Sequence, residues 1–222
     1  MTADPALFAP TECSMLVSWP VFLTRLQQLE DWLWIDGPAA LRVALPRTPV
    51  MLAQRVHALS DLYTTRRDQA LDQAQQQEHR VARLFYFLFS DAPKIACVLH
   101  ELAERKALPA TPRWRVTDLG AGCGATSVGL LLALDSRCVA ALELTGLDLE
   151  PSLLRDWRIL VQQAARLAGV DLTIHTTAVD LSDPTCAYGQ EPGDVVMTQA
   201  LMNELPWARA HAEGLTAGAD RR

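Results

Sequence analysis

The stretch VTDLGAGCGATSVGLL, residues 116–131, combines the three patterns that decide the fold of this chain. A short hydrophobic run ends near Asp118, and three glycines then follow within the five residues 120–124. An amphipathic run begins at Ala125. A strand followed by a glycine-rich turn and a helix is typical of a parallel α/β sheet. We therefore expect the first strand, turn and helix of such a sheet here.

Strand patterns and helix patterns alternate on both sides of this turn. We expect strands at 114–120, 142–150, 171–181 and 193–201, and helices at 125–136 and 151–170. Strands that alternate with helices predict right-handed βαβ units, and hence a Rossmann-like parallel sheet. The fourth strand is apolar on both faces, so an additional strand would normally cover its free edge.

The first half of the chain carries helical periodicity instead. After a loose lead-in at 1–19, residues 20–108 form a predicted helical region, and residues 109–222 form the α/β domain. Apolar residues three and four apart predict a helix over 20–35 and one or two helices over 49–89. A further helix is expected to open at Asp91, with Pro93 in its first turn.

Composition narrows the function classes. Half of the 222 residues are hydrophobic, 21% are charged, and the net charge is −6. Neither half is basic, so no large nucleic-acid footprint is evident. No apolar stretch is long enough to span a membrane, and no signal peptide is visible, which predicts a cytoplasmic protein. The five cysteines are scattered without a C-x-x-C pair, which argues against a zinc site and a disulfide framework.

The glycine turn lies where parallel sheets bind ligands, at the carboxyl edge. Glycine allows unusual backbone angles there, and the positive end of the next helix favours an anionic group. Asp148 ends the second predicted strand, where a carboxylate can accept both hydroxyls of a ribose. Asp180 follows the third predicted strand.

Two ligands fit this pattern. A dinucleotide fingerprint is satisfied by Gly120, Gly122 and Ala125, whereas an S-adenosylmethionine loop is satisfied by Asp118 with Gly120, Gly122 and Gly124. Asp118 favours the second ligand, because a carboxylate repels a pyrophosphate and suits an ammonium and a sulfonium. The carboxylates of Asp118, Asp148 and Asp180 follow one another at three successive predicted strands, which also supports S-adenosylmethionine.

The motifs resemble those of class I S-adenosylmethionine-dependent methyltransferases. DLGAGCG resembles their first motif, LTGLDLE the ribose-binding motif, AVDLSD the adenine-side motif, and GDVVMTQALMNEL the strand at the pocket floor. More narrowly, three features are similar to the small-ribosomal-subunit methyltransferase-like family associated with mitochondrial and bacterial ribosomes: the helical lead HRVARLFYFLFSDAPKIACVLHEL, the glycine loop and the late MNEL.

This resemblance implies roles for individual residues. Asp118 would orient the amino group of the cofactor, directly or through water, and Asp148 would hold the ribose hydroxyls. The implied cofactor contacts are Asp118, Gly120, Ala121, Gly122, Gly124, Asp148, Leu149, Asp180, Leu181, Thr198 and Gln199. Methyl transfer is an in-line displacement that depends mainly on positioning, and no catalytic residue or metal ligand is identified.

The resemblance also implies a seven-stranded sheet in the order 3-2-1-4-5-7-6, of which only four strands are found, so we expect a C-terminally incomplete domain. The expected function is methylation of ribosomal RNA or a role in small-subunit assembly. The alternatives are a non-catalytic assembly factor that keeps the cofactor fold and, third, an NAD(P)-dependent oxidoreductase. Structural roles are alternatives for all three carboxylates. Asp118 could cap the turn that follows it, Asp148 could be a helix N-cap, and Asp180 could belong to a plain turn.

Overall fold

The strands form one parallel sheet, as the sequence predicts. The computed structural model describes residues 14–42, 48–65, 77–183 and 193–199. The strand order is β3-β2-β1-β4. The strands are β1 (Arg113–Leu119), β2 (Ala141–Asp148), β3 (Asp171–Ala178) and β4 (Val195–Thr198). Order and direction both match a Rossmann-like α/β fold, so this fold class is confirmed.

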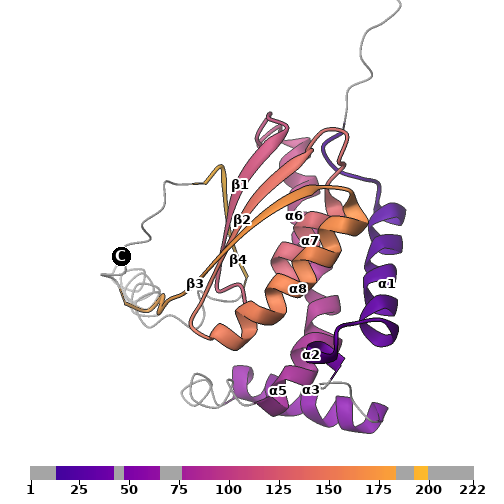
Figure 1. Cartoon of the computed structure of the whole chain (residues 1–222), viewed down its shortest axis with the longest axis vertical. Coiled ribbons are helices and arrows are strands. Elements are labelled where there is room, and N and C mark those ends of the chain that lie inside the picture. The colour runs from indigo at the N-terminus through magenta and orange to yellow at the C-terminus, as the bar shows by residue number, and fades with distance from the viewer. Residues whose placement is uncertain (1–13, 43–47, 66–76, 184–192, 200–222) are drawn as a thin grey trace, which may run out of the picture.

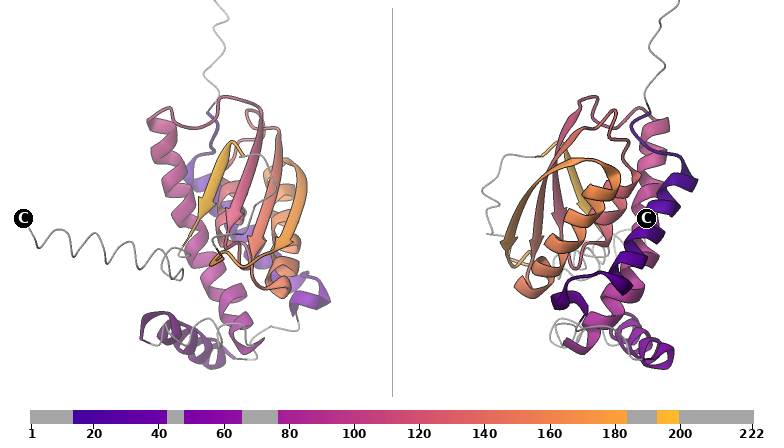
Figure 2. Two further views of the ribbon diagram at one scale, coloured as in Figure 1. Left: turned by 90° about the vertical axis from the view of Figure 1, so that its left-hand side faces the viewer. Right: turned by 45° about the vertical axis from the view of Figure 1, so that its right-hand side comes forward.

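The crossover helices lie on one side of this sheet. Helix α7 (Ala125–Ala133) joins β1 to β2, and helix α8 (Pro151–Ala168) joins β2 to β3. Figures 1 and 2 show both helices on the same side of the sheet, with two helices from the first half of the chain packed behind them. Residues Thr126–Ala133 are all buried, because α7 is enclosed between the sheet and its neighbouring helices.

The N-terminal region is helical, as expected. Its elements are α1 (Trp19–Ile35), α2 (Ala39–Arg42), α3 (Pro49–Thr64), α5 (Gln77–Ala82), the π-helical turn η2 (Arg83–Phe87) and α6 (Leu88–Glu104). The main core joins this region to the sheet, since Phe22 and Leu29 of α1 share one buried cluster with Trp114 and Trp157. A smaller cluster of Leu59, Leu62 and Ala82 holds α3 to α5.

A close helix contact anchors the two parts to each other. Gly129 of α7 faces α6, and a Cβ atom at this position would lie 2.2 Å from the Ala92 carbonyl oxygen and 2.2 Å from Ile95 Cγ2. Only glycine permits this approach. Arg25 of α1 adds a polar link, because its guanidinium donates to the carbonyl oxygens of Leu132 and Leu134 at 3.0 and 2.8 Å.

Two expectations from the sequence are wrong. No helix begins at Asp91, because the chain is helical from Gln77 through η2 to Glu104, with Pro93 inside α6. Proline removes one backbone donor, yet its fixed φ angle still fits the helix. Cys138 is disulfide-bonded, whereas Cys97 and Cys123 are free. Cysteines that are scattered in sequence can still meet in a fold, so their spacing was a poor guide.

None of the described helices combines the length and apolar character that crossing a membrane requires.

The end of the predicted lead-in packs against the α/β domain. Leu16 is buried and forms an isolated antiparallel bridge with Leu134, just before α1 begins.

Candidate functional site

The glycine turn connects β1 to α7 in a conformation that requires glycine. Gly120, Gly122 and Gly124 have φ angles of 69°, 53° and 104°, all in the left-handed region. The amide groups of Gly120 and Ala121 both donate to the Leu147 carbonyl oxygen at 2.9 Å. These two bonds fix the turn against the end of β2, so the predicted loop residues do lie at the carboxyl edge of the sheet.

Asp118 lies beneath this turn, with no exposed surface. The Ser127 hydroxyl donates to Asp118 Oδ2 at 2.5 Å, and the Trp157 indole N–H donates to the Ser127 oxygen at 3.1 Å. Asp118 Oδ1 is buried and has no hydrogen-bond partner within the described part of the chain. Asp118 therefore contacts the third residue of α7 through its side chain, and one of its oxygens is left for another donor.

Burial changes the acidity of this carboxyl group. Desolvation raises the pKa of Asp118 to about 7, the hydrogen bonds from Ser127 and Trp157 lower it, and the charge of Asp148 raises it. Removing a carboxylate from water disfavours its charged form, and a nearby carboxylate acts in the same direction. Near neutral pH, Asp118 is thus divided between the protonated and ionised forms.

Asp148 ends β2 directly beside the turn. Its Oδ2 atom accepts the Gly122 amide at 2.8 Å, and its Oδ1 atom accepts the Glu150 amide at 2.9 Å. The N-cap of α8 is Glu150, whose side chain accepts the Ser152 amide at 3.1 Å. The alternative that Asp148 caps this helix is therefore wrong. Asp148 is half-buried, and each of its oxygens keeps a lone pair for a further donor.

Asp180 and Leu181 follow β3 and are arranged differently. Asp180 is exposed, and its Oδ1 atom accepts the Ser182 amide at 2.8 Å and the Ser182 hydroxyl at 2.6 Å. These bonds are ordinary turn chemistry, the alternative weighed from the sequence. Leu181 is buried. Leu149, which the resemblance places against an adenine, is 46% exposed after β2.

Thr198 and Gln199, the two site residues predicted from the fourth strand, lie in different surroundings. Gln199 comes to the start of α7, where its side-chain oxygen accepts the Thr126 hydroxyl at 3.2 Å. Thr198 is exposed at the end of β4 and pairs in register with Leu119. The carboxyl edge therefore brings together the glycine turn, Asp118, Asp148 and Gln199.

Several residues near the turn were not predicted from the sequence. Ser127 and Trp157 complete the buried hydrogen bonds to Asp118, and Thr126 contacts Gln199. The sequence carries a weak indication of the role of Ser127, since this residue lies in the first turn of the predicted helix. It carries none for Trp157, because only the packing of α8 brings this residue under the turn.

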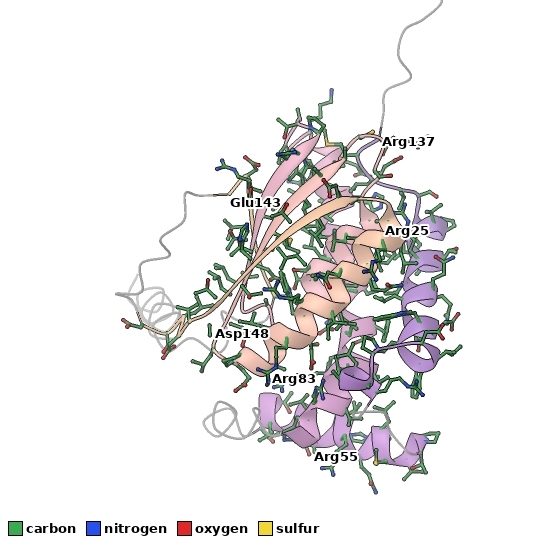
Figure 3. The ribbon with its side chains drawn as sticks, in the orientation of Figure 1. Arg25, Arg55, Arg83, Arg137, Glu143 and Asp148 are labelled. Carbon is green, nitrogen blue, oxygen red and sulfur yellow. The ribbon has the colours of Figure 1, made fainter. Side chains whose placement is uncertain are left out.

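The π-helical turn η2 also contacts the glycine turn. The Cys123 thiol donates to the Arg83 carbonyl oxygen at 3.5 Å. Burial raises the pKa of Cys123 to about 12, and the positive charge of Arg83 opposes that rise. Figure 3 shows Arg83 and Asp148 at the same end of the molecule, where the strands end. A cation thus lies within electrostatic range of the turn.

Arg80 of α5 is paired with a buried carboxylate of α8. Its Nε and Nη2 atoms donate to the two carboxylate oxygens of Asp156 at 2.6 and 2.7 Å. Asp156 is buried on α8, so this ion pair joins α5 to the α/β domain. The pKa of Arg80 is raised, chiefly by the hydrogen bond to Asp156.

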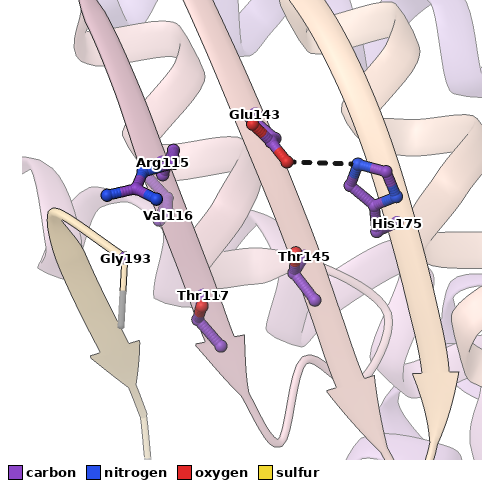
Figure 4. Close-up of a pocket in the computed structure, with 7 residues that line it drawn as sticks. All are labelled: Arg115, Val116, Thr117, Glu143, Thr145, His175 and Gly193. Atoms are coloured by element: carbon purple, nitrogen blue, oxygen red, sulfur yellow. Dashed lines mark ion pairs between the residues drawn. The ribbon is translucent and has the colours of Figure 1, made fainter. Parts of the chain in front are cut away.

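A hollow lies on the sheet face opposite the helices (Figure 4). Its volume is about 290 Å³, and its lining comprises Arg115, Val116, Thr117, Glu143, Thr145, His175 and Gly193. Glu143 Oε1 and His175 Nε2 are 3.4 Å apart, with both side chains about half exposed. None of the cofactor contacts implied by the resemblance lies in this hollow.

No protein-family model matches the chain, and no curated protein is similar to it in sequence.

Proposed function

We propose that this protein binds S-adenosylmethionine at the carboxyl edge of its sheet and acts as a methyltransferase. The observation that carries the proposal is the pair of carboxylates at the glycine turn. Asp118 lies beneath the turn with one oxygen unpartnered among the described residues, and Asp148 holds the Gly122 amide. A ligand that carries an ammonium and a sulfonium is stabilised by nearby carboxylates.

Asp118 disfavours a dinucleotide, whereas Asp148 suits the ribose of either ligand. A pyrophosphate in this turn would approach the partly ionised Asp118, which costs Coulomb energy in a partly dry site. The turn also places Gly124 immediately before α7, so the positive end of the helix dipole lies at the turn. This end of the helix suits the carboxylate of an amino-acid cofactor, whereas the side-chain carboxylates suit its cationic groups.

The proposed acceptor is ribosomal RNA, or a component of the small ribosomal subunit during assembly. This part of the proposal rests on the resemblance of the helical lead and of MNEL. Methyl transfer needs an acceptor held in line with the methyl group rather than a dedicated acid or base. A chain that binds the cofactor without turnover would instead be a non-catalytic assembly factor.

Calorimetry with S-adenosylmethionine and with NAD tests the cofactor. We expect heat only with S-adenosylmethionine, and a rise in Kd of about 10-fold or more for Asp148→Ala, because a hydrogen bond to a charged group contributes roughly 1.5–3 kcal/mol. The matched control is Asp171→Ala, which removes an exposed carboxylate at the opposite end of β3. Heat with NAD alone, or equal affinities in the two variants, contradicts the proposal.

Transfer is tested separately with S-adenosylmethionine labelled in its methyl group. Small-subunit ribosomal RNA, naked and within immature subunits, is incubated with the protein and the cofactor. Label that enters the RNA supports the methyltransferase. Binding of the cofactor with no label in either substrate favours the non-catalytic assembly factor.

A further inference from the structure

Three buried side chains from three different elements form a chain of hydrogen bonds beneath the glycine turn. The Trp157 indole on α8 donates to the Ser127 hydroxyl on α7, and this hydroxyl donates to the Asp118 carboxylate on β1. Trp157 and Ser127 are 0% exposed, as is Asp118. We name these three residues the Trp157–Ser127–Asp118 relay.

Two glycines make room for the indole of this relay. A Cβ atom at Gly124 would lie 3.0 Å from Trp157 Cδ1, and one at Gly146 would lie 2.9 Å from the six-membered part of the ring. Gly146 of β2 is also the in-register neighbour of Asp118 on β1. The indole is therefore packed between the glycine turn and the strand beside Asp118, which limits its movement.

We propose that Ser127 and Trp157 are positioning residues that orient the Asp118 carboxylate and stabilise its ionised form, and that the protein releases a proton from Asp118 when a cationic ligand binds. The proposal rests on the proposed cofactor site. The Ser127 hydroxyl is bonded to Oδ2, so the buried Oδ1 is the oxygen on which the positive charge of the ligand acts, through one water or across the turn. The proton leaves Asp118 for solvent, and the charge that remains is balanced by the ligand.

The charges around Asp118 oppose its ionisation unless the relay and a ligand offset them. Asp148 at the end of β2 opposes ionisation of Asp118, and burial opposes it further. Three groups favour the ionised form of Asp118: the hydroxyl of Ser127, the indole N–H of Trp157 and the amino-terminal end of α7. From η2, the cation of Arg83 lies on the Cys123 side of the turn. A cationic ligand adds the missing positive charge, so binding and ionisation support each other.

Calorimetry in two buffers of different ionisation enthalpy measures the released protons directly. Wild-type protein is titrated with S-adenosylmethionine between about pH 5.5 and pH 8.5. We expect release that approaches one proton per site at acid pH and falls toward zero at alkaline pH. The affinity should rise with pH over the same range, because an ionised Asp118 binds the ligand better.

The variants Ser127→Ala and Trp157→Phe test the relay. Ser127→Ala removes a hydrogen bond to a charged group, so the midpoint of proton release should move upward by about one pH unit. Trp157→Phe keeps an aromatic ring and should move it in the same direction by less. Asp118→Asn should abolish the release. The control is Trp114→Phe, a buried tryptophan whose indole donates to the Thr111 carbonyl oxygen at the far end of β1; its midpoint should equal that of the wild type.

The outcomes separate the two proposals. No heat with S-adenosylmethionine at any pH overturns the cofactor site and the relay together. If wild-type protein binds the cofactor but the midpoint stays the same in Ser127→Ala and Trp157→Phe, the relay is overturned and the cofactor site stands. A purely structural role would weaken binding at every pH equally, and it would also leave the midpoint in place.

Discussion

The two faces of the sheet differ in chemistry although they belong to the same strands. On the helix-covered face, Trp114, Val116 and Leu144 are fully or almost fully buried. On the other face, the in-register positions of β1–β3 carry polar groups: Arg115, Thr117, Glu143, Thr145, Thr173 and His175. A parallel sheet that is covered on both faces normally has apolar residues throughout. The described part of the fold therefore gains most of its packing energy from one face.

The largest expected effect is on the helix-covered face. Gly129→Leu introduces a side chain where even a Cβ atom would lie 2.2 Å from the backbone of α6. We expect the free energy of unfolding to fall by about 5 kcal/mol or more, measured by urea unfolding followed by circular dichroism. Thr173→Leu places the same side chain at an exposed position on the opposite face, and should change the free energy of unfolding by at most about 0.5 kcal/mol. Equal losses in both variants would refute the contrast between the faces.

The next effect depends on pH. The pKa of Asp118 is raised to about 7 from its ordinary value of 3.8. Below about pH 4 both the native and the unfolded protein are protonated at this site. Between about pH 4 and pH 7 only the native state keeps the proton, so stability falls as the pH rises. Above pH 7, the free energy of unfolding has fallen by a total on the order of 4 kcal/mol.

Asp118→Asn should remove this dependence, because the amide does not titrate. Urea unfolding at several pH values between about 4.5 and 8 measures it, with Asp171→Asn as an exposed control. The wild type and the control should lose stability relative to Asp118→Asn as the pH rises. Parallel curves for all three proteins would show that Asp118 does not titrate in this range.

A smaller loss is expected where the helical region meets α8. Asp156→Ala leaves the Arg80 guanidinium without the carboxylate that binds both its Nε and Nη2 atoms. Removing one partner of a buried ion pair should cost about 3 kcal/mol in thermal or urea unfolding. The double variant Arg80→Met with Asp156→Leu should recover much of that loss. A single variant as stable as the wild type would contradict the structural role of the pair.

The smallest effect is expected in the polar hollow on the opposite face. Glu143 and His175 are 3.4 Å apart, but 46% of each side chain is exposed. Exposed ion pairs contribute little, so Glu143→Gln should change stability by about 0.5 kcal/mol or less at any pH. A loss of more than about 2 kcal/mol in urea unfolding would contradict the small contribution expected of this exposed pair.

The sequence predicted the strands, the crossover helices and the glycine turn because each depends on local rules. The period of apolar residues gives the strands and helices of 113–178, and the run of left-handed backbone angles requires Gly120, Gly122 and Gly124. Sequence reasoning also placed Asp148 correctly at the end of its strand. It did not predict that Pro93 lies within a helix that runs on from Gln77, since a proline allows either outcome.

Local sequence patterns are thus enough to predict the order of the elements and the acidic, glycine-rich edge of the sheet. The environment of Asp118, in contrast, depends on tertiary packing. Its burial, its bond to Ser127 and the nearby indole of Trp157 result from the packing of α7 and α8 on the sheet. The same packing decided that Asp180 is used by its own turn and that Arg80 pairs with Asp156. Backbone periodicity is local, whereas burial and the charges that act on a buried group depend on residues far apart in the chain.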